Sequence, residues 1–107
     1  MKPVPLTDLA GVIRSKNSGP FELTLDVFFR SPDIYRHAKE RQLISAELIQ
    51  RLYHVPPERI LGVVWFDPAC AAKVTIARPV SSGSPADTDV YGAQQHMPLA
   101  LAMVPWD

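Results

Sequence analysis

The chain has 107 residues, of which 47% are hydrophobic, and this is enough for one compact domain with a modest core. Eleven lysines and arginines balance eleven aspartates and glutamates without a block of like charge, which excludes the electrostatic pattern of a general binder of nucleic acids or anionic membranes. The single cysteine, Cys70, excludes an internal disulfide, and the sequence has no Cys/His cluster of the kind that holds a structural zinc. We therefore expect a single domain over residues 1–107.

The N-terminal part predicts one clear strand and one ambiguous segment. Residues 6–13 fit a helix by the spacing of their apolar side chains, but their end also fits a strand, and we favour a strand or an irregular extended piece. Residues 21–29 alternate between apolar and polar side chains, which predicts a strand with one face in the core. Phe28 interrupts the polar face, so we expect that face to be partly covered near the strand's end by the fold or by another subunit.

Two helices are predicted next. Ser31 and Pro32 form a helix start, with serine as N-cap and proline at the first helical position, ahead of residues 34–42. A second amphipathic helix begins at Ser45 and ends before Pro56. Together they predict a helical cover over a sheet.

The C-terminal half predicts further strands. Residues 60–66 form a continuous apolar run, the pattern of a strand that is buried on both faces and central in its sheet. A short helical turn is expected at residues 69–72, and alternation predicts strands at residues 73–77 and 99–103. The order of elements predicts an α+β two-layer sandwich, ferredoxin-like in style, with two helices on a mixed or antiparallel sheet of about four to five strands.

The polar segment at residues 14–20 is expected to be a loop that forms an anion cradle. Arg14 and Lys16 supply positive charge, and Asn17 and Ser18 tolerate turn conformations that direct backbone N–H groups inward. A carboxylate or phosphate suits such a loop better than a cation. The alternative interpretation is a polar hairpin turn with solvated basic side chains.

A second polar segment, residues 78–96, is long enough to suggest a functional loop. We expect its hydroxyl and carboxamide groups to contact the same anion, and His96 or Asp87 to transfer a proton. The ligand-contacting residues proposed here are Ser82, Gln94 and Gln95. His96 can equally be a histidine whose ring nitrogens are satisfied by nearby backbone. Asp87, Asp89 and His96 are metal-compatible residue types without a recognised motif spacing, so no metal site is predicted.

The chain also resembles a known family at these segments. Its motifs are Arg-Ser-Lys-Asn-Ser-Gly-Pro at 14–20, Phe-Asp-Pro-Ala at 66–69, and two runs within 78–96, Arg-Pro-Val-Ser-Ser-Gly-Ser-Pro and Asp-Thr-Asp-Val-Tyr-Gly-Ala-Gln-Gln-His. They resemble a family of small proteins catalogued as a domain of unknown function, over nearly the whole chain. That family is similar in layout to the C-terminal ferredoxin-fold domain of the acyclic terpene utilisation proteins. The resemblance implies a small partner or subunit in bacterial carboxylic-acid or acyl-CoA metabolism, and it supplies no catalytic residues.

Two functions of different class follow from these observations. The first is an accessory subunit or small enzyme that binds an organic anion between residues 14–20 and 81–96, which we expect to lie close in space. The second is a non-catalytic interaction module, in a homo-oligomer or with a larger hydratase-like chain. Neither function needs a cofactor. We expect a homo-oligomer because of the apolar surface around Phe28, Trp65, Trp106 and residues 99–104.

The expected location is the cytoplasm. The first residues lack the apolar segment of a secretion signal, and no apolar run approaches the length of a membrane span.

Overall fold

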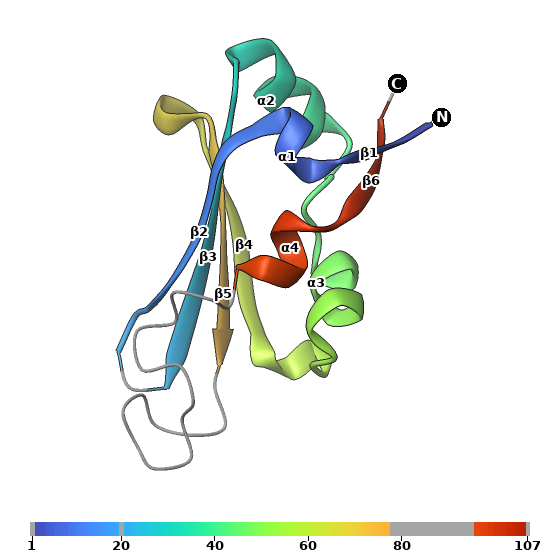
Figure 1. Cartoon of the computed structure of the whole chain (residues 1–107). Helices are drawn as coiled ribbons and strands as arrows, with labels where there is room; N and C mark the ends of the chain where they lie inside the picture. Colours follow the sequence, from blue (N-terminus) through green and yellow to red (C-terminus); the bar gives the residue numbers. More distant parts are fainter. Residues whose placement is uncertain (1, 20, 78–95, 107) are drawn as a thin grey trace.

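The computed structural model describes residues 2–19, 21–77 and 96–106, and it has an α+β architecture (Figure 1). Four strands form an antiparallel sheet in the order β2-β3-β5-β4, and β1 pairs with β6 in a separate antiparallel sheet. The strands are β1 (Lys2–Pro5), β2 (Ala10–Asn17), β3 (Glu22–Phe29), β4 (Ile60–Phe66), β5 (Ala71–Ala77) and β6 (Met103–Trp106). The predicted α+β sandwich with an antiparallel sheet is confirmed.

The central strand β3 follows the alternation of its sequence. Leu23, Leu25, Val27 and Phe29 are buried in the main hydrophobic core. Phe21, which the alternation places in the strand, lies one residue before it and is 55% exposed. The strand pairs with β2 on one side and β5 on the other, so Leu23, Leu25 and Val27 each have a partner residue on both flanks.

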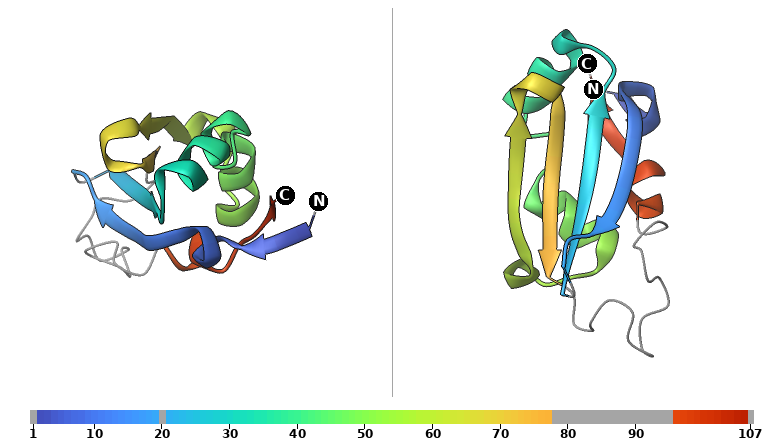
Figure 2. Two further views of the ribbon diagram at one scale, coloured as in Figure 1. Left: turned by 90° about the horizontal axis from the view of Figure 1, so that it is seen from above. Right: turned by 90° about the vertical axis from the view of Figure 1, so that its left-hand side faces the viewer.

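Two helices cover one face of the four-stranded sheet (Figure 2). They are α2 (Pro32–Glu40) and α3 (Ala46–Tyr53). The Ser31 hydroxyl accepts from the Ile34 backbone N–H at 3.1 Å, and the Ser45 hydroxyl accepts from the Leu48 N–H at 3.2 Å. The predicted N-cap at Ser31 is therefore confirmed, and Ser45, predicted as the start of the second helix, is also an N-cap. Each satisfies an N–H that the helix itself leaves unpaired. None of the described helices is long and apolar enough to cross a membrane.

The prediction that residues 60–66 form the central strand is wrong. β4 lies at the edge of its sheet, and Leu61, Val64 and Phe66 are more than half exposed. β5 follows β4 in the chain but lies between β4 and β3, so β3 and β4 run parallel and are joined by α2 and α3. An apolar run alone does not distinguish an interior strand from an edge strand whose outer side chains face solvent.

The segments next to the termini differ from the predicted extended structure. Residues 6–13 begin with a single helical turn, α1 (Leu6–Leu9), before β2, and residues 99–103 include part of α4 (Met97–Ala100) before β6. In these helical turns the side chains of Leu6 and Leu99 are fully buried in the core. In an extended strand, successive side chains would instead have pointed to opposite faces. Two short 3-10 turns, η1 (Pro57–Arg59) and η2 (Asp67–Ala69), precede β4 and β5, and the turn expected at residues 69–72 begins two residues earlier.

Candidate anion-binding site

The face of the four-stranded sheet opposite α2 and α3 carries two of the predicted site residues, Arg14 and Lys16. It is the face turned toward the viewer in the right-hand view of Figure 2, with the helices behind the sheet. The strand register arranges its side chains in rows that cross all the strands in the order β2, β3, β5, β4. The rows are Val12, Phe28, Ala71 and Phe66; then Arg14, Asp26, Lys73 and Val64; then Lys16, Thr24, Thr75 and Gly62.

Arg14 and Lys16 lie in a strand, so the prediction that residues 14–20 form a loop is wrong for its first half. Both residues belong to β2, and alternation along a strand places them on the same face. The polar composition of this segment reflects a strand with one face toward solvent. Ser15, between them, is buried against the helix-covered side, opposite Leu25.

Arg14 is already engaged on this face. Its Nε donates to the Asp26 Oδ2 at 3.1 Å, and its guanidinium lies over the Phe28 ring at 4.9 Å from the centroid. The Arg14 side chain is 55% exposed, whereas that of Asp26 is 9% exposed. The ion pair thus joins a largely solvated cation to a buried carboxylate, and Phe28 fixes the plane of the guanidinium.

A groove of about 370 Å³ lies over the charged row and the apolar row. It is lined by Arg14, Lys16, Asp26, Phe28, Val64, Phe66, Ala69, Ala71 and Lys73. Three of these side chains are cationic and one is acidic, so the lining has a net positive charge. An anion of small-metabolite size fits such a groove, since the apolar wall from β3 and β4 accommodates carbon and the lysines accommodate oxygen.

Asn17, Ser18 and Gly19 lie at the end of β2 and in the turn that leads to β3. Asn17 ends β2, and the Ser18 backbone N–H donates to the Glu22 carbonyl at 2.9 Å. Gly19, with φ at 93°, occupies a conformation that glycine adopts without strain. This turn closes the hairpin, as the alternative interpretation of the sequence expected, and its Ser18 N–H group is directed at the chain itself.

The second polar segment lies almost entirely outside the described residues. Ser82, Asp87, Asp89, Gln94 and Gln95 belong to that part, and their predicted roles stay predictions. His96 is the residue before α4 and is half-buried. Within residues 2–19, 21–77 and 96–106, no three His, Cys, Asp or Glu side chains gather closely enough to hold a metal ion.

The groove contains residues that the sequence interpretation missed. Lys73, Val64 and Phe66 reach the site because β5 inserts between β3 and β4. The alternation of Thr24 and Asp26 with core residues was visible in the sequence, but the site was expected between two polar loops and not on this strand face. The neighbours across the sheet were not visible, because strand order is set by contacts distant in sequence.

A second polar cluster ties α2 to the turn after β4. The Tyr35 hydroxyl donates to Asp67 Oδ1 at 2.5 Å, and Lys39 Nζ donates to the same oxygen at 2.9 Å. Burial, assisted by the bond to Asp67 and its negative charge, raises the pKa of Tyr35 to about 12. The bonds from Tyr35 and Lys39 lower the pKa of Asp67 below its ordinary value. Asp67 belongs to the Phe-Asp-Pro-Ala motif. Through these two hydrogen bonds it anchors α2 to the turn after β4.

A family model described as "Domain of unknown function (DUF4387)" matches residues 6–103. Because this match spans most of the 107 residues, the chain belongs to that family. No curated protein and no solved structure matches the chain in the corresponding comparisons. The resemblance to a family of unknown function is therefore confirmed, whereas the similarity to the terpene utilisation proteins, and with it the ferredoxin-like layout, is not.

Proposed function

We propose that this member of the family binds a small organic anion, with a carboxylate as its charged group, in the groove on the uncovered face of the sheet. The observation that carries the proposal is the lining of that groove, in which Arg14, Lys16 and Lys73 come from two different strands and face one acid, Asp26. The proposed site keeps Arg14 and Lys16, the basic residues that the sequence suggested. Side chains of β5 and β4 form the other wall of the groove.

The geometry supports separate roles for the charged side chains. Asp26 accepts from Nε of Arg14, which leaves the Nη groups of that guanidinium to donate to a ligand. Lys16 and Lys73 flank the pair, one row away on β2 and in the same row on β5. A carboxylate between these cations would gain charge-assisted hydrogen bonds, each worth about 1.5–3 kcal/mol when partly shielded from water.

The apolar row of the groove supports a ligand with a carbon body. Phe28 and Phe66 line the groove from β3 and β4, next to the small side chains of Ala69 and Ala71. This arrangement suits a short carboxylic acid or the acyl end of a thioester better than inorganic phosphate. It agrees with a role in carboxylic-acid or acyl-CoA metabolism in the cytoplasm, as an accessory subunit or small partner of a larger hydratase-like chain.

Proton transfer by His96 or Asp87 remains part of this proposal as a separate step. Ser82, Gln94 and Gln95 would complete the ligand contacts. Substitution of His96 by asparagine would then abolish turnover in the partner complex while leaving carboxylate binding at the sheet intact.

A second candidate function is an interaction module, and a specific observation favours it. Val12, Val64 and Phe66 are each more than half exposed on the same face as the groove. An apolar patch rimmed by charge is also typical of a protein interface. In this alternative the sheet face packs against a second copy or a larger chain, and the cations pair with acids of that partner.

Titration calorimetry separates the two functions. Succinate, citrate and an acyl-CoA are titrated into the wild type, into Arg14→Ala/Lys16→Ala, and into the charge-matched control Arg36→Ala/Lys2→Ala. The proposal expects a saturable heat that the first double variant loses and the control keeps. No heat at millimolar ligand, together with a dimer mass in light scattering that Phe66→Ser converts to monomer, would favour the interaction module.

A further inference from the structure

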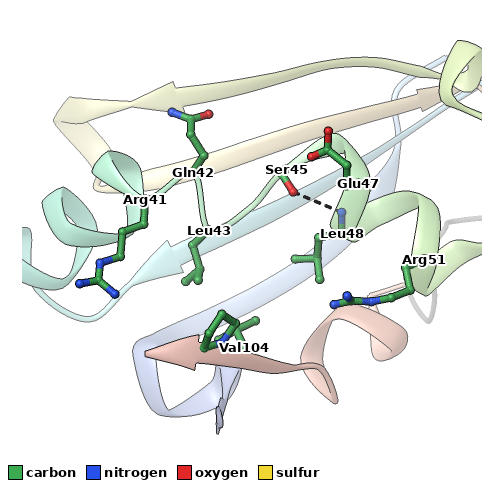
Figure 3. A pocket seen from close by; sticks show the side chains of 9 residues that line it. Arg41, Gln42, Leu43, Ser45, Glu47, Leu48, Arg51 and Val104 are labelled. Carbon is green, nitrogen blue, oxygen red and sulfur yellow. Dashed lines mark hydrogen bonds between the residues drawn. The ribbon is translucent and has the colours of Figure 1, made fainter. Parts of the chain in front are cut away.

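A second cavity lies on the helical side of the molecule, away from the sheet groove. It has a volume of about 540 Å³ and is bordered by the connection between α2 and α3, the first turns of α3, and β6 (Figure 3). Its lining comprises Arg41, Gln42, Leu43, Ser45, Glu47, Leu48, Arg51, Val104 and Pro105. This volume falls within the usual range of small-molecule sites, about 300–1,000 Å³.

The base of this cavity is apolar. Leu43, Leu48 and Val104 are buried core residues that reach its surface from three different elements, and Pro105 extends the base along β6. Figure 3 shows the side chains of Leu43, Leu48 and Val104 grouped at the centre of the cavity. A carbon chain placed there would bury apolar surface against residues that are already fixed by the core.

The rim of the cavity is positively charged. Arg41 and Arg51 lie on its two flanks, and Glu47 is its one acid. In Figure 3 the Arg51 guanidinium extends beneath Leu48 toward Val104, whereas the Glu47 carboxylate points to the opposite side. Among the described residues, no acid is within ion-pair distance of Arg51. Its guanidinium is placed to meet a carboxylate whose carbon chain lies on the apolar base.

The walls are held by their own hydrogen bonds. The Leu43 N–H donates to the Ala38 carbonyl at 3.0 Å, and the Gln42 side chain donates to the Lys39 carbonyl at 3.2 Å. Gln42 has a φ of 53°, a left-handed conformation that turns the chain sharply out of α2. Ser45 then caps α3 through the Leu48 N–H. The connection is thus fixed at both ends, and a ligand would find a preformed cavity.

We infer that this cavity is a binding site for an amphipathic monocarboxylate, with the carboxylate at Arg51 and the carbon chain on Leu43, Leu48 and Val104. Unlike the sheet groove, which sets three cations around a buried acid, this cavity pairs a flanking arginine with an apolar base. Its preferred ligand therefore carries one charge and a longer apolar part. The inference does not depend on the anion site of the sheet.

The test is an amide-resolved NMR titration of the full chain with hexanoate, its uncharged analogue hexanamide, and acetate. We expect hexanoate to shift the backbone amides of Leu43, Leu48, Arg51 and Val104 in a saturable manner. Hexanamide should bind at least about tenfold more weakly because it lacks the charge-assisted bond, and acetate should leave these amides unchanged because it lacks the chain.

Three variants test whether hexanoate binds at Arg51. Arg51→Gln should weaken hexanoate binding about tenfold or more, whereas the control Arg36→Gln, an exposed arginine of α2, should leave it unchanged. Arg14→Ala/Lys16→Ala should also leave it unchanged, which separates this site from the sheet groove. Equal binding of hexanoate and hexanamide, equal binding by Arg51→Gln and Arg36→Gln, or no shift at the lining residues would each overturn the inference.

Discussion

The two faces of the four-stranded sheet are built from the same strands, but their buried side chains are shielded from solvent in different ways. On the helix-covered face, Leu25 and Val74 are fully buried beneath α2 and α3 and the termini. On the other face, Thr24 and Asp26 are also buried, although none of the described helices covers them. There, the Thr24 hydroxyl donates to the Lys16 carbonyl at 3.3 Å and the Asp26 carboxylate accepts from Arg14 Nε at 3.1 Å, so both polar groups are satisfied by the neighbouring strand β2.

The buried polar groups of Thr24 and Asp26 are thus held by hydrogen bonds to the neighbouring strand. The covered face is shielded by whole elements, so its stability depends on packing. On the uncovered face, Val64 is 58% exposed and the Arg14 side chain is 55% exposed, so we expect substitutions of these side chains to cost less stability than truncations on the covered face.

The largest effect is expected from matched valine truncations on the two faces. Val74→Ala, at a site that is 0% exposed, should lower the free energy of unfolding by about 2–3 kcal/mol through lost burial and a residual cavity. Val64→Ala, at a site that is 58% exposed on the neighbouring strand, should change it by less than about 0.5 kcal/mol. Urea denaturation measures both values. Similar losses for the two variants would show that the uncovered face is packed against something in solution.

A smaller effect is expected from the charged row. Arg14→Ala removes the partner of the buried Asp26 carboxylate, and we expect a loss of about 1–2 kcal/mol in the free energy of unfolding. Lys16→Ala should cost less than about 0.5 kcal/mol. A silent Arg14→Ala would indicate that water replaces the guanidinium at Asp26. The same urea titrations supply the comparison.

Alkaline pH should weaken the anchor between α2 and the sheet. The folded state holds the Tyr35 proton with a pKa of about 12 against an ordinary value of 10.0, so the free energy of unfolding falls as pH rises from about 10 to about 12. Tyr35→Phe should reduce this fall. Tyr53 contributes in the same direction, since burial also raises its pKa to about 12. Thermal melts of the wild type and of Tyr35→Phe between neutral pH and pH 11 measure how the melting temperature falls with pH. The same fall in both proteins would contradict a contribution from Tyr35.

The smallest effect is expected at acid pH. Hydrogen bonds from Tyr35 and Lys39 lower the pKa of Asp67 in the folded state, so its contribution is present above the ordinary carboxyl pKa of about 4 and is lost as pH falls further. Asp67→Asn should therefore flatten the decline of the melting temperature below about pH 4. Because the carboxylate is largely exposed, salt should reduce the wild-type slope as well. A parallel decline in both proteins would rule out this source of acid sensitivity.

The sequence correctly predicted features that depend on residues close together in the chain. The caps at Ser31 and Ser45 depend on a hydroxyl and an N–H three residues away, and the alternation of β3 depends only on side-chain period. The edge position of β4 and the insertion of β5 depend on pairing between distant segments, and the apolar run of residues 60–66 therefore led to the wrong prediction of a central strand. The sequence proposed Arg14 and Lys16 as site residues, and that role stays a prediction. Their polarity suggested a loop because the solvent-facing side of β2 could not be distinguished from a turn.

The central claim is that the uncovered sheet face binds a carboxylate through Arg14, Lys16 and Lys73. The most direct test is an amide-resolved NMR titration with succinate, in the wild type and in Lys16→Ala/Lys73→Ala, which leaves the pair of Arg14 and Asp26 in place. The account predicts saturable shifts at the groove residues of β2, β3 and β5, weakened about tenfold or more in the variant. It is contradicted if these amides do not move at millimolar succinate, or if they move equally in both proteins.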